Sequence, residues 1–81
     1  MKQIKPDEVI NLKGVPCPQN SAKALLKLAG MSKNDILEII LDEGEPKENV
    51  PASIEMEDNC EIITLIKSKD DLWHLFVKVT Q

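Results

Sequence analysis

The chain has 81 residues, of which 42% are hydrophobic and 30% are charged, and its formal net charge at pH 7 is −4. This length and balance predict one globular domain over residues 1–81 and exclude an intrinsically disordered chain. All ten basic residues are lysines and only two residues are aromatic, a composition that argues against direct binding of nucleic acid, which depends on phosphate neutralisation and base stacking.

Neither a signal peptide nor a membrane-spanning segment is evident in the sequence. The first fifteen residues contain no long apolar run, and no stretch approaches the ~18–20 apolar residues that cross a bilayer. We therefore expect a soluble, cytoplasmic protein without a membrane partner. Cys17 and Cys60 are expected to remain free thiols in that reducing compartment.

The first predicted elements are a short strand and an amphipathic helix. Residues 8–12 have strand character, and Gly14 then turns the chain toward the helix. The helix is predicted over residues 18–29, with Pro18 at its first position and Gly30 ending it in a left-handed conformation. The apolar residues that helical spacing places on one face are Ala22, Leu25, Leu26 and Ala29. The polar residues expected on the opposite face are Asn20, Lys23 and Lys27.

A second strand and a second helix follow. Residues 35–42 are rich in isoleucine and leucine and alternate in part, as a strand does. The apolar residues expected on one side of this strand are Leu37, Ile39 and Leu41. After an acidic turn, a helix is predicted to begin near Pro46, with Val50 and Ile54 four residues apart on its apolar face. Pro51 lies inside this helix and is expected to kink it or to delay its start.

Two last strands, residues 60–67 and 72–80, are predicted to form a hairpin through the turn at residues 68–71. Two helices cannot cover both faces of a four-stranded sheet. We therefore predict an α/β (α+β) two-layer sandwich of order β-α-β-α-β-β, with a mixed sheet and both helices on one face. Ile36 and Ile40 would lie on the uncovered face, where they either fill the sheet or form a contact surface for a partner or a second copy.

Cys17 lies between two prolines immediately before the first helix, and this placement is the most informative feature of the sequence. A helix amino terminus carries unpaired N–H groups and about half a positive elementary charge. A thiol held there ionises more readily than a free thiol, whose pKa is ~8.5. The alternative is a buried structural cysteine, but a Pro-Cys-Pro turn is an unusual place to bury one. The sequence therefore predicts a reactive nucleophile.

Residues 14–20, Gly-Val-Pro-Cys-Pro-Gln-Asn, resemble the Gly-x-x-Cys-Pro-x-Pro signature of the TusA family of sulfur-carrier proteins. The resemblance spans nearly the whole chain. It includes the acidic turn at residues 42–45 and the tripeptide at residues 49–51, Asn-Val-Pro, where members usually carry Asp-Ile-Pro. The chain departs from the signature at Asn20, which stands in place of the second proline, and it is similar to a branch of the family with Cys-Pro-x-Asn.

The resemblance implies a carrier of persulfide sulfur that uses no cofactor of its own. A cysteine desulfurase or another donor protein would transfer sulfur to Cys17, and the carrier would pass it to a downstream acceptor protein. Pro18 would be the rigid residue behind the cysteine, and Gly14 the start of the signature. Asn20 in place of proline is expected to leave the helix intact while removing some rigidity. Such a carrier is a transferase only if a protein that holds the transferred sulfur covalently is counted as an enzyme.

Other polar residues are expected to have structural roles. Lys23 and Lys27 are expected to lie on a solvated face of the helix. The alternative is that they bind an acidic patch of a partner protein near the Cys17 end. Cys60 is expected to pack at the start of the third strand rather than to handle sulfur, and His74 to be a surface-facing strand residue. No spacing typical of a metal site is present. Four carboxylates near the second helix have a spacing that fits no calcium-binding loop, so a solvated turn is expected rather than a cation site. They are Asp42, Glu43, Glu45 and Glu48.

Two other functions stay open at this point. A monothiol glutaredoxin-like redox protein also places Cys-Pro at a helix start, and Val50-Pro51 faintly resembles the cis-proline segment of that fold. Helical sequence follows Pro51, however, where that fold needs a strand. A non-catalytic regulatory or RNA-binding module would rest on a fold analogy with the C-terminal domain of a translation initiation factor, which the negative charge and the absence of arginine disfavour.

Overall fold

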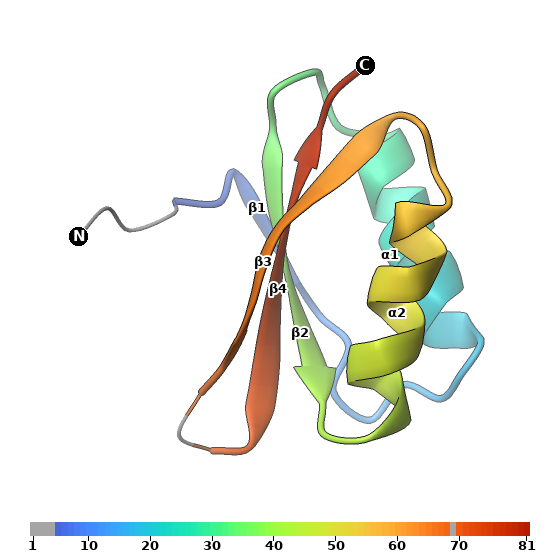
Figure 1. Ribbon diagram of the computed structural model, residues 1–81, viewed down its shortest axis with the longest axis vertical. Helices are drawn as coiled ribbons and strands as arrows, with labels where there is room; N and C mark the ends of the chain where they lie inside the picture. The colour runs from blue at the N-terminus through green and yellow to red at the C-terminus, as the bar shows by residue number, and fades with distance from the viewer. Residues whose placement is uncertain (1–4, 69) are drawn as a thin grey trace.

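Four strands and two helices make up the computed structural model, which describes residues 5–68 and 70–81 (Figure 1). In chain order the elements are β1 (Glu8–Asn11), α1 (Gln19–Ala29), β2 (Ile36–Asp42), α2 (Glu45–Glu55), β3 (Cys60–Lys67) and β4 (Leu72–Val79). This order confirms the β-α-β-α-β-β prediction, and every element end that the sequence predicted lies within one residue of the observed one. Lys69, in the predicted hairpin turn, lies outside the described residues.

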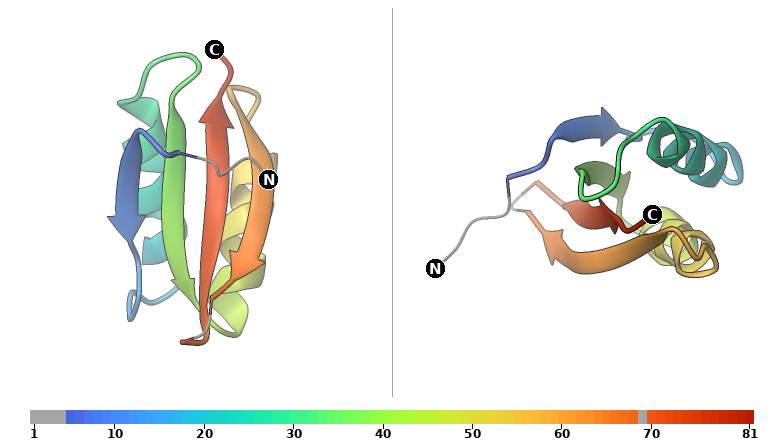
Figure 2. Two further views of the ribbon diagram at one scale, coloured as in Figure 1. Left: turned by 90° about the vertical axis from the view of Figure 1, so that its left-hand side faces the viewer. Right: turned by 90° about the horizontal axis from the view of Figure 1, so that it is seen from above.

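The four strands form one mixed sheet in the order β1-β2-β4-β3. β1 runs parallel to β2, whereas β4 is antiparallel to both of its neighbours. Both helices pack on the same face of the sheet, so the molecule has two layers (Figures 1 and 2). The predicted two-layer sandwich is therefore confirmed.

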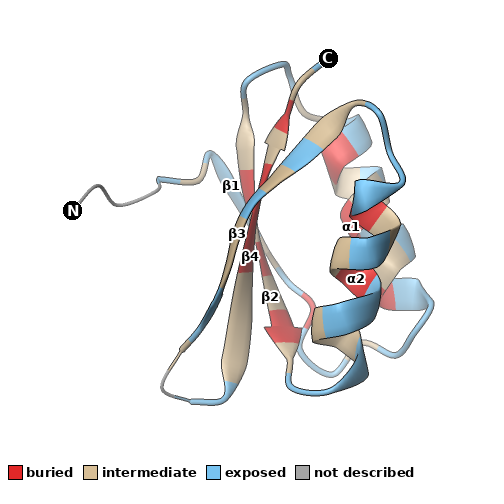
Figure 3. Cartoon of the chain, in the orientation of Figure 1, coloured by how far each residue is buried: buried red, intermediate tan, exposed pale blue. Residues whose placement is uncertain are grey.

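The core lies between the sheet and the two helices. Alternation along β2 buries one side of the strand, as predicted, and the helical period of α2 buries its facing stripe. Figure 3 shows the buried residues gathered where the helices face the sheet. The buried apolar residues of this cluster are Leu12, Ala24, Leu28, Leu37, Ile39, Leu41, Val50, Ile54, Leu75, Val77 and Val79.

The predicted orientation of α1 is wrong except at Leu25, which is partly buried and packs against the core. Its buried residues are Asn20, Ala24 and Leu28, spaced four apart, whereas Leu26 is 76% exposed. Ala22 and Ala29, which were expected to face the core, are also exposed. Because an alanine presents only one methyl group, little free energy is lost when it faces solvent, so the alanines did not distinguish the two faces.

The ends of the helices also differ from expectation. Gly30 follows α1 with φ −90° and ψ 0°, so it is not left-handed, and its N–H donates to the Lys27 carbonyl at 3.2 Å. Pro51 does not delay α2, which begins at Glu45 after a left-handed Gly44 (φ 105°) and continues past Pro51.

The sheet face away from the helices is half-covered by its own side chains. Ile36 and Ile40 lie there half-buried, and Phe76, paired with Glu38 on the same face, is only 9% exposed. His74 lies on this face too and is half-buried, with its Nδ1 atom 2.7 Å from a carboxylate oxygen of Glu38. The side chains thus fill much of this face, and a contact surface for a partner or second copy stays a prediction.

Candidate functional site

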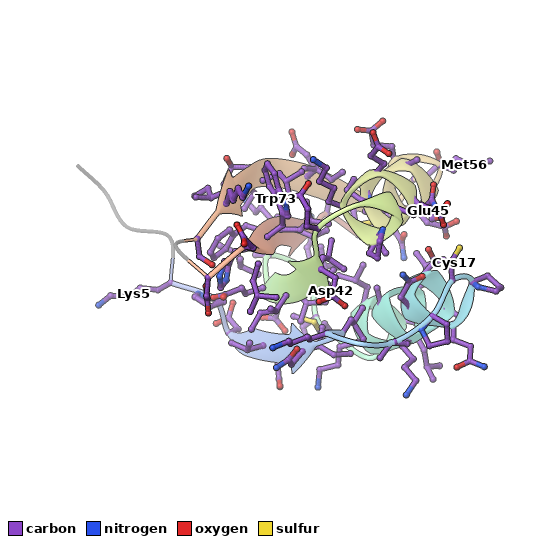
Figure 4. All side chains as sticks on the ribbon, turned by 90° about the horizontal axis from the view of Figure 1, so that it is seen from below. Lys5, Cys17, Asp42, Glu45, Met56 and Trp73 are labelled. Atoms are coloured by element: carbon purple, nitrogen blue, oxygen red, sulfur yellow. The ribbon has the colours of Figure 1, made fainter. Side chains whose placement is uncertain are left out.

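Cys17 is exposed and stands immediately before the amino terminus of α1. Pro18 is the N-cap residue, with φ −93° and ψ 9°, so it lies one position earlier than the first helical position expected for it. The peptide bond between Cys17 and Pro18 is cis. Figure 4 shows the Cys17 side chain at the end of the helical layer, between α1 and α2. The predicted placement of an accessible thiol at a helix tip is confirmed.

Two N–H groups of the first turn of α1 bond within the helix start rather than to the sulfur. The Asn20 N–H donates to the Pro16 carbonyl at 3.0 Å, and the Ser21 N–H donates to the Asn20 Oδ1 atom at 2.7 Å. A helix dipole favours negative charge at its first turn, and Cys17 directly precedes the N-cap residue of α1.

A turn centred on Gly14 fixes the loop that precedes the cysteine. Gly14 has φ +79°, a left-handed conformation that glycine adopts without steric cost. Its N–H donates to the Asp42 Oδ2 atom at 2.6 Å, which connects the loop to the end of β2. The Val15 N–H closes the turn by donating to the Leu12 carbonyl at 3.0 Å. Asp42 thus has a defined structural role that the predicted solvated turn did not include.

Helix α2 contributes the side chain that contacts the sulfur. The Asn49 Nδ2 atom donates to the Cys17 Sγ atom at 3.8 Å. One turn further along α2, the Ser53 hydroxyl donates to the Ser21 hydroxyl at 3.3 Å. Sequence reasoning had no role for these residues, but the spacing of four between Asn49 and Ser53, with buried Val50 beside them, indicates one shared stripe of α2.

Asn20 is fully buried, contrary to the expectation that it lies on the polar face of α1. Its Oδ1 atom accepts from Ser21, but its Nδ2 atom has no hydrogen-bond partner among the residues that the structure describes. Asn20 therefore contributes to the interior under the Cys17 loop rather than to the surface around the sulfur.

The two lysines expected near the cysteine end of α1 lie at different positions along the helix. Lys27 is in the last turn of α1 and pairs with Glu8 of β1 at 3.1 Å, so it is not beside Cys17. Lys23 lies closer to the helix start and, with Leu26 and Met31, lines an open groove of about 520 Å³ between α1 and β1.

The acidic turn is held by basic and aromatic side chains. Glu43 pairs with Lys47 at 2.6 Å and with Lys67 at 3.2 Å, and the Trp73 indole N–H donates to it at 2.9 Å. These three partners lower the pKa of Glu43 to about 2. Both lysines also lie over the Trp73 ring, at 4.7 and 5.9 Å from its centre. The turn is thus an ion-pair cluster joining α2 to the β3–β4 hairpin.

Cys60, the second cysteine, has a different environment from the exposed thiol. Cys60 is half-buried at the start of β3, and its Sγ atom donates to the Ile54 carbonyl at 3.7 Å. Burial raises the pKa of the Cys60 thiol, and the charge of Glu57 raises it further. Over residues 5–68 and 70–81, no three side chains of the metal-ligating types come together. In the same part of the chain, no helix combines the length and apolar character needed to cross a bilayer.

Two comparisons with known proteins show which sequences this chain is similar to. The sequence profile of a family described as "Sulfurtransferase TusA" matches residues 8–79. A protein of Archaeoglobus fulgidus described as "Putative sulfur carrier protein" is 31% identical over 77 residues, which cover 95% of this chain and 86% of that relative. The matched region includes Cys17 and all six elements of the fold.

Proposed function

Because the chain belongs to the TusA sulfurtransferase family, we propose that it is a sulfur carrier whose Cys17 holds sulfur as a persulfide. The observation that carries this proposal is the exposure of Cys17 at the tip of α1, in a loop held by the hydrogen bond from Gly14 to Asp42. An exposed thiol can reach the persulfide of a donor protein and can then be reached by an acceptor thiol.

The transfer needs no oxidant or reductant. In loading, the Cys17 thiolate attacks the outer sulfur of a persulfide on the donor protein. A new S–S bond forms at Cys17 as the S–S bond of the donor breaks, and the donor cysteine leaves as a thiolate. In delivery, an acceptor thiolate attacks the outer sulfur on Cys17, and Cys17 is the leaving thiolate.

The surroundings suit a carrier that engages two partners in turn. We expect the donor to be a cysteine desulfurase or another persulfide-bearing protein, and the acceptor to present a thiolate. We expect Gly14 and Pro18 to set the direction of the loop, and Lys23 to meet a carboxylate of a partner. Lys27 would join such a contact only at its far end, since it lies in the last turn of the helix.

The redox alternative is less compatible with these features. A dithiol mechanism needs a nearby resolving cysteine, whereas Cys60 is half-buried and bonded to the Ile54 carbonyl. The monothiol glutaredoxin fold needs a strand after its proline, whereas α2 continues through Pro51 to Glu55. An RNA-binding function is disfavoured by the exposed carboxylates of α2, Glu45, Glu48 and Glu55.

The proposal is tested by intact-mass spectrometry after the chain is mixed with a cysteine desulfurase and free cysteine. We expect an adduct of about 32 Da, the mass of one sulfur atom, that dithiothreitol removes. Cys17→Ser should abolish the adduct and Cys60→Ser should retain it. A parent chain that stays unmodified, while a known carrier is loaded in the same mixture, would contradict the proposal.

A further inference from the structure

We propose that the side-chain amide of Asn49 is a catalytic residue that stabilises the Cys17 sulfur as the leaving thiolate when sulfur is delivered. This inference rests on the proposed function and adds a residue to it. The Asn49 Nδ2 atom donates to Sγ itself at 3.8 Å, and in a persulfide Sγ is the inner sulfur. The inner sulfur is the atom that gains negative charge as the outer sulfur departs.

The position of Asn49 is set by the packing of α2 against α1. The next residue, Val50, is fully buried, which fixes the rotation of α2 about its axis. Ser53 lies one turn beyond Asn49 and hydrogen-bonds Ser21, four residues beyond Cys17. Asn49 and Ser53, one turn apart on α2, thus contact Cys17 and Ser21, which are four residues apart at the start of α1. The contact between Asn49 and Cys17 is one step of this interhelical pairing.

Over residues 5–68 and 70–81, Asn49 is the side chain that donates a hydrogen bond to Sγ. The backbone N–H groups of Asn20 and Ser21 donate to other acceptors. A neutral amide suits this role because its N–H stabilises the leaving thiolate without placing a positive charge beside it.

The amide affects loading and delivery differently at alkaline pH. Stabilising a thiolate lowers its nucleophilicity but makes it a better leaving group. Once the thiol is fully ionised, the amide therefore gives loading no advantage, while delivery still benefits. This asymmetry separates a catalytic role of Asn49 from a merely structural one.

The experiment uses the full chain carrying Cys60→Ser, loaded chemically with inorganic polysulfide so that no donor protein is needed. After the excess polysulfide is removed, 2-mercaptoethanol is added and loss of the adduct of about 32 Da is followed by intact mass. Return to the mass of the unmodified chain measures attack on the outer sulfur, and a mixed disulfide measures attack on Sγ. Asn49→Ala is compared with Gln19→Ala, which removes an exposed side-chain amide near the cysteine that has no hydrogen bond to Sγ among the described residues.

We expect Asn49→Ala to slow delivery by about threefold to tenfold at about pH 10, as loss of one hydrogen bond to a developing anion would do, without slowing loading. Gln19→Ala should stay within about twofold of the parent. Delivery by Asn49→Ala within about twofold of the parent, or an equal loss in Gln19→Ala, would overturn the inference.

A measurement on the parent chain keeps the inference testable if the Asn49 variant does not fold. The side-chain amide NMR signals of Asn49 should shift with pH as Cys17 ionises and should lose this shift in Cys17→Ser. Asn49 amide signals that behave the same way in the parent chain and in Cys17→Ser would overturn the role of Asn49. Because polysulfide loading bypasses the donor protein, failure of either test leaves loading by a desulfurase as a separate question.

Discussion

The carboxylate of Asp42 accepts a hydrogen bond of 2.6 Å from the backbone N–H of Gly14, 28 residues earlier in the chain. Asp42 is the last residue of β2, and Gly14 begins the loop that ends at Cys17. The bond therefore fixes the reactive loop to the rigid layer of the molecule. It restrains the loop that carries the thiol, while Asn49 of α2 contacts the sulfur itself.

Replacing Asp42 should loosen this loop. Asp42→Ala removes a charged acceptor and should lower the free energy of unfolding by about 1–2 kcal/mol. Asp42→Asn retains an acceptor oxygen and should lose about half as much. Urea denaturation measures both variants, and hydrogen exchange of the Gly14 amide reports the loop directly. Parent-like stability and exchange in Asp42→Ala would mean that the bond does not hold the loop.

The corrected orientation of α1 makes opposite predictions for two leucines on one helix. Leu28 is 3% exposed, so Leu28→Ala should reduce the free energy of unfolding by about 2–5 kcal/mol through lost burial and a cavity. Leu26 is 76% exposed, so Leu26→Ala should change it by less than about 0.5 kcal/mol. Chemical denaturation of the pair tests the orientation, and a larger loss in Leu26→Ala would restore the face expected from the sequence.

The Glu43 cluster makes stability depend on pH in the acid range. Its pKa is lowered from 4.5 to about 2 by Lys47, Trp73 and Lys67. The stabilisation is therefore fully present above pH 4.5 and is lost as the pH falls through the folded-state value of about 2.

The matching variant is Glu43→Gln. It should be less stable than the parent near neutral pH, and the difference should shrink between pH 4.5 and about 2. Because the carboxylate is close to solvent, added salt should also reduce the difference. Urea midpoints across this range measure it, and a difference that stays constant with pH would show that the carboxylate is not held in its charged form.

The two cysteines should differ in reactivity. Burial and the charge of Glu57 raise the pKa of Cys60, so its thiolate is scarce near neutral pH. Cys17 is exposed at the helix tip. Brief treatment with iodoacetamide at about pH 7 should therefore label Cys17 alone, as read by peptide mapping. Labelling of Cys60 at a comparable rate would contradict the different environments of the two thiols.

The sequence predicted the element order and the placement of the thiol because both depend on local patterns. Alternation along β2 and the spacing of Val50 and Ile54 identified buried positions in the correct places. The Cys-Pro step marked the helix start within one residue. These signals need only near neighbours in the chain.

The features that were missed depend on contacts between distant segments. The face of α1 is set by packing against α2 and the sheet, which buries Asn20 and leaves Leu26 in solvent. Asn49 reaches Cys17 across 32 residues of sequence, and His74 meets Glu38 across 36. Charge and polarity alone do not specify which side chains such packing brings together.

The central claim is that sulfur resides on Cys17, and its location is measured most directly by peptide mapping. The unmutated chain is loaded by a desulfurase with cysteine carrying heavy sulfur, the persulfides are capped by alkylation, and the digest is sequenced by mass. The account predicts labelled sulfur on the peptide that contains Cys17 and none on the peptide that contains Cys60. Label on Cys60, or sulfur bound to neither cysteine, would contradict it.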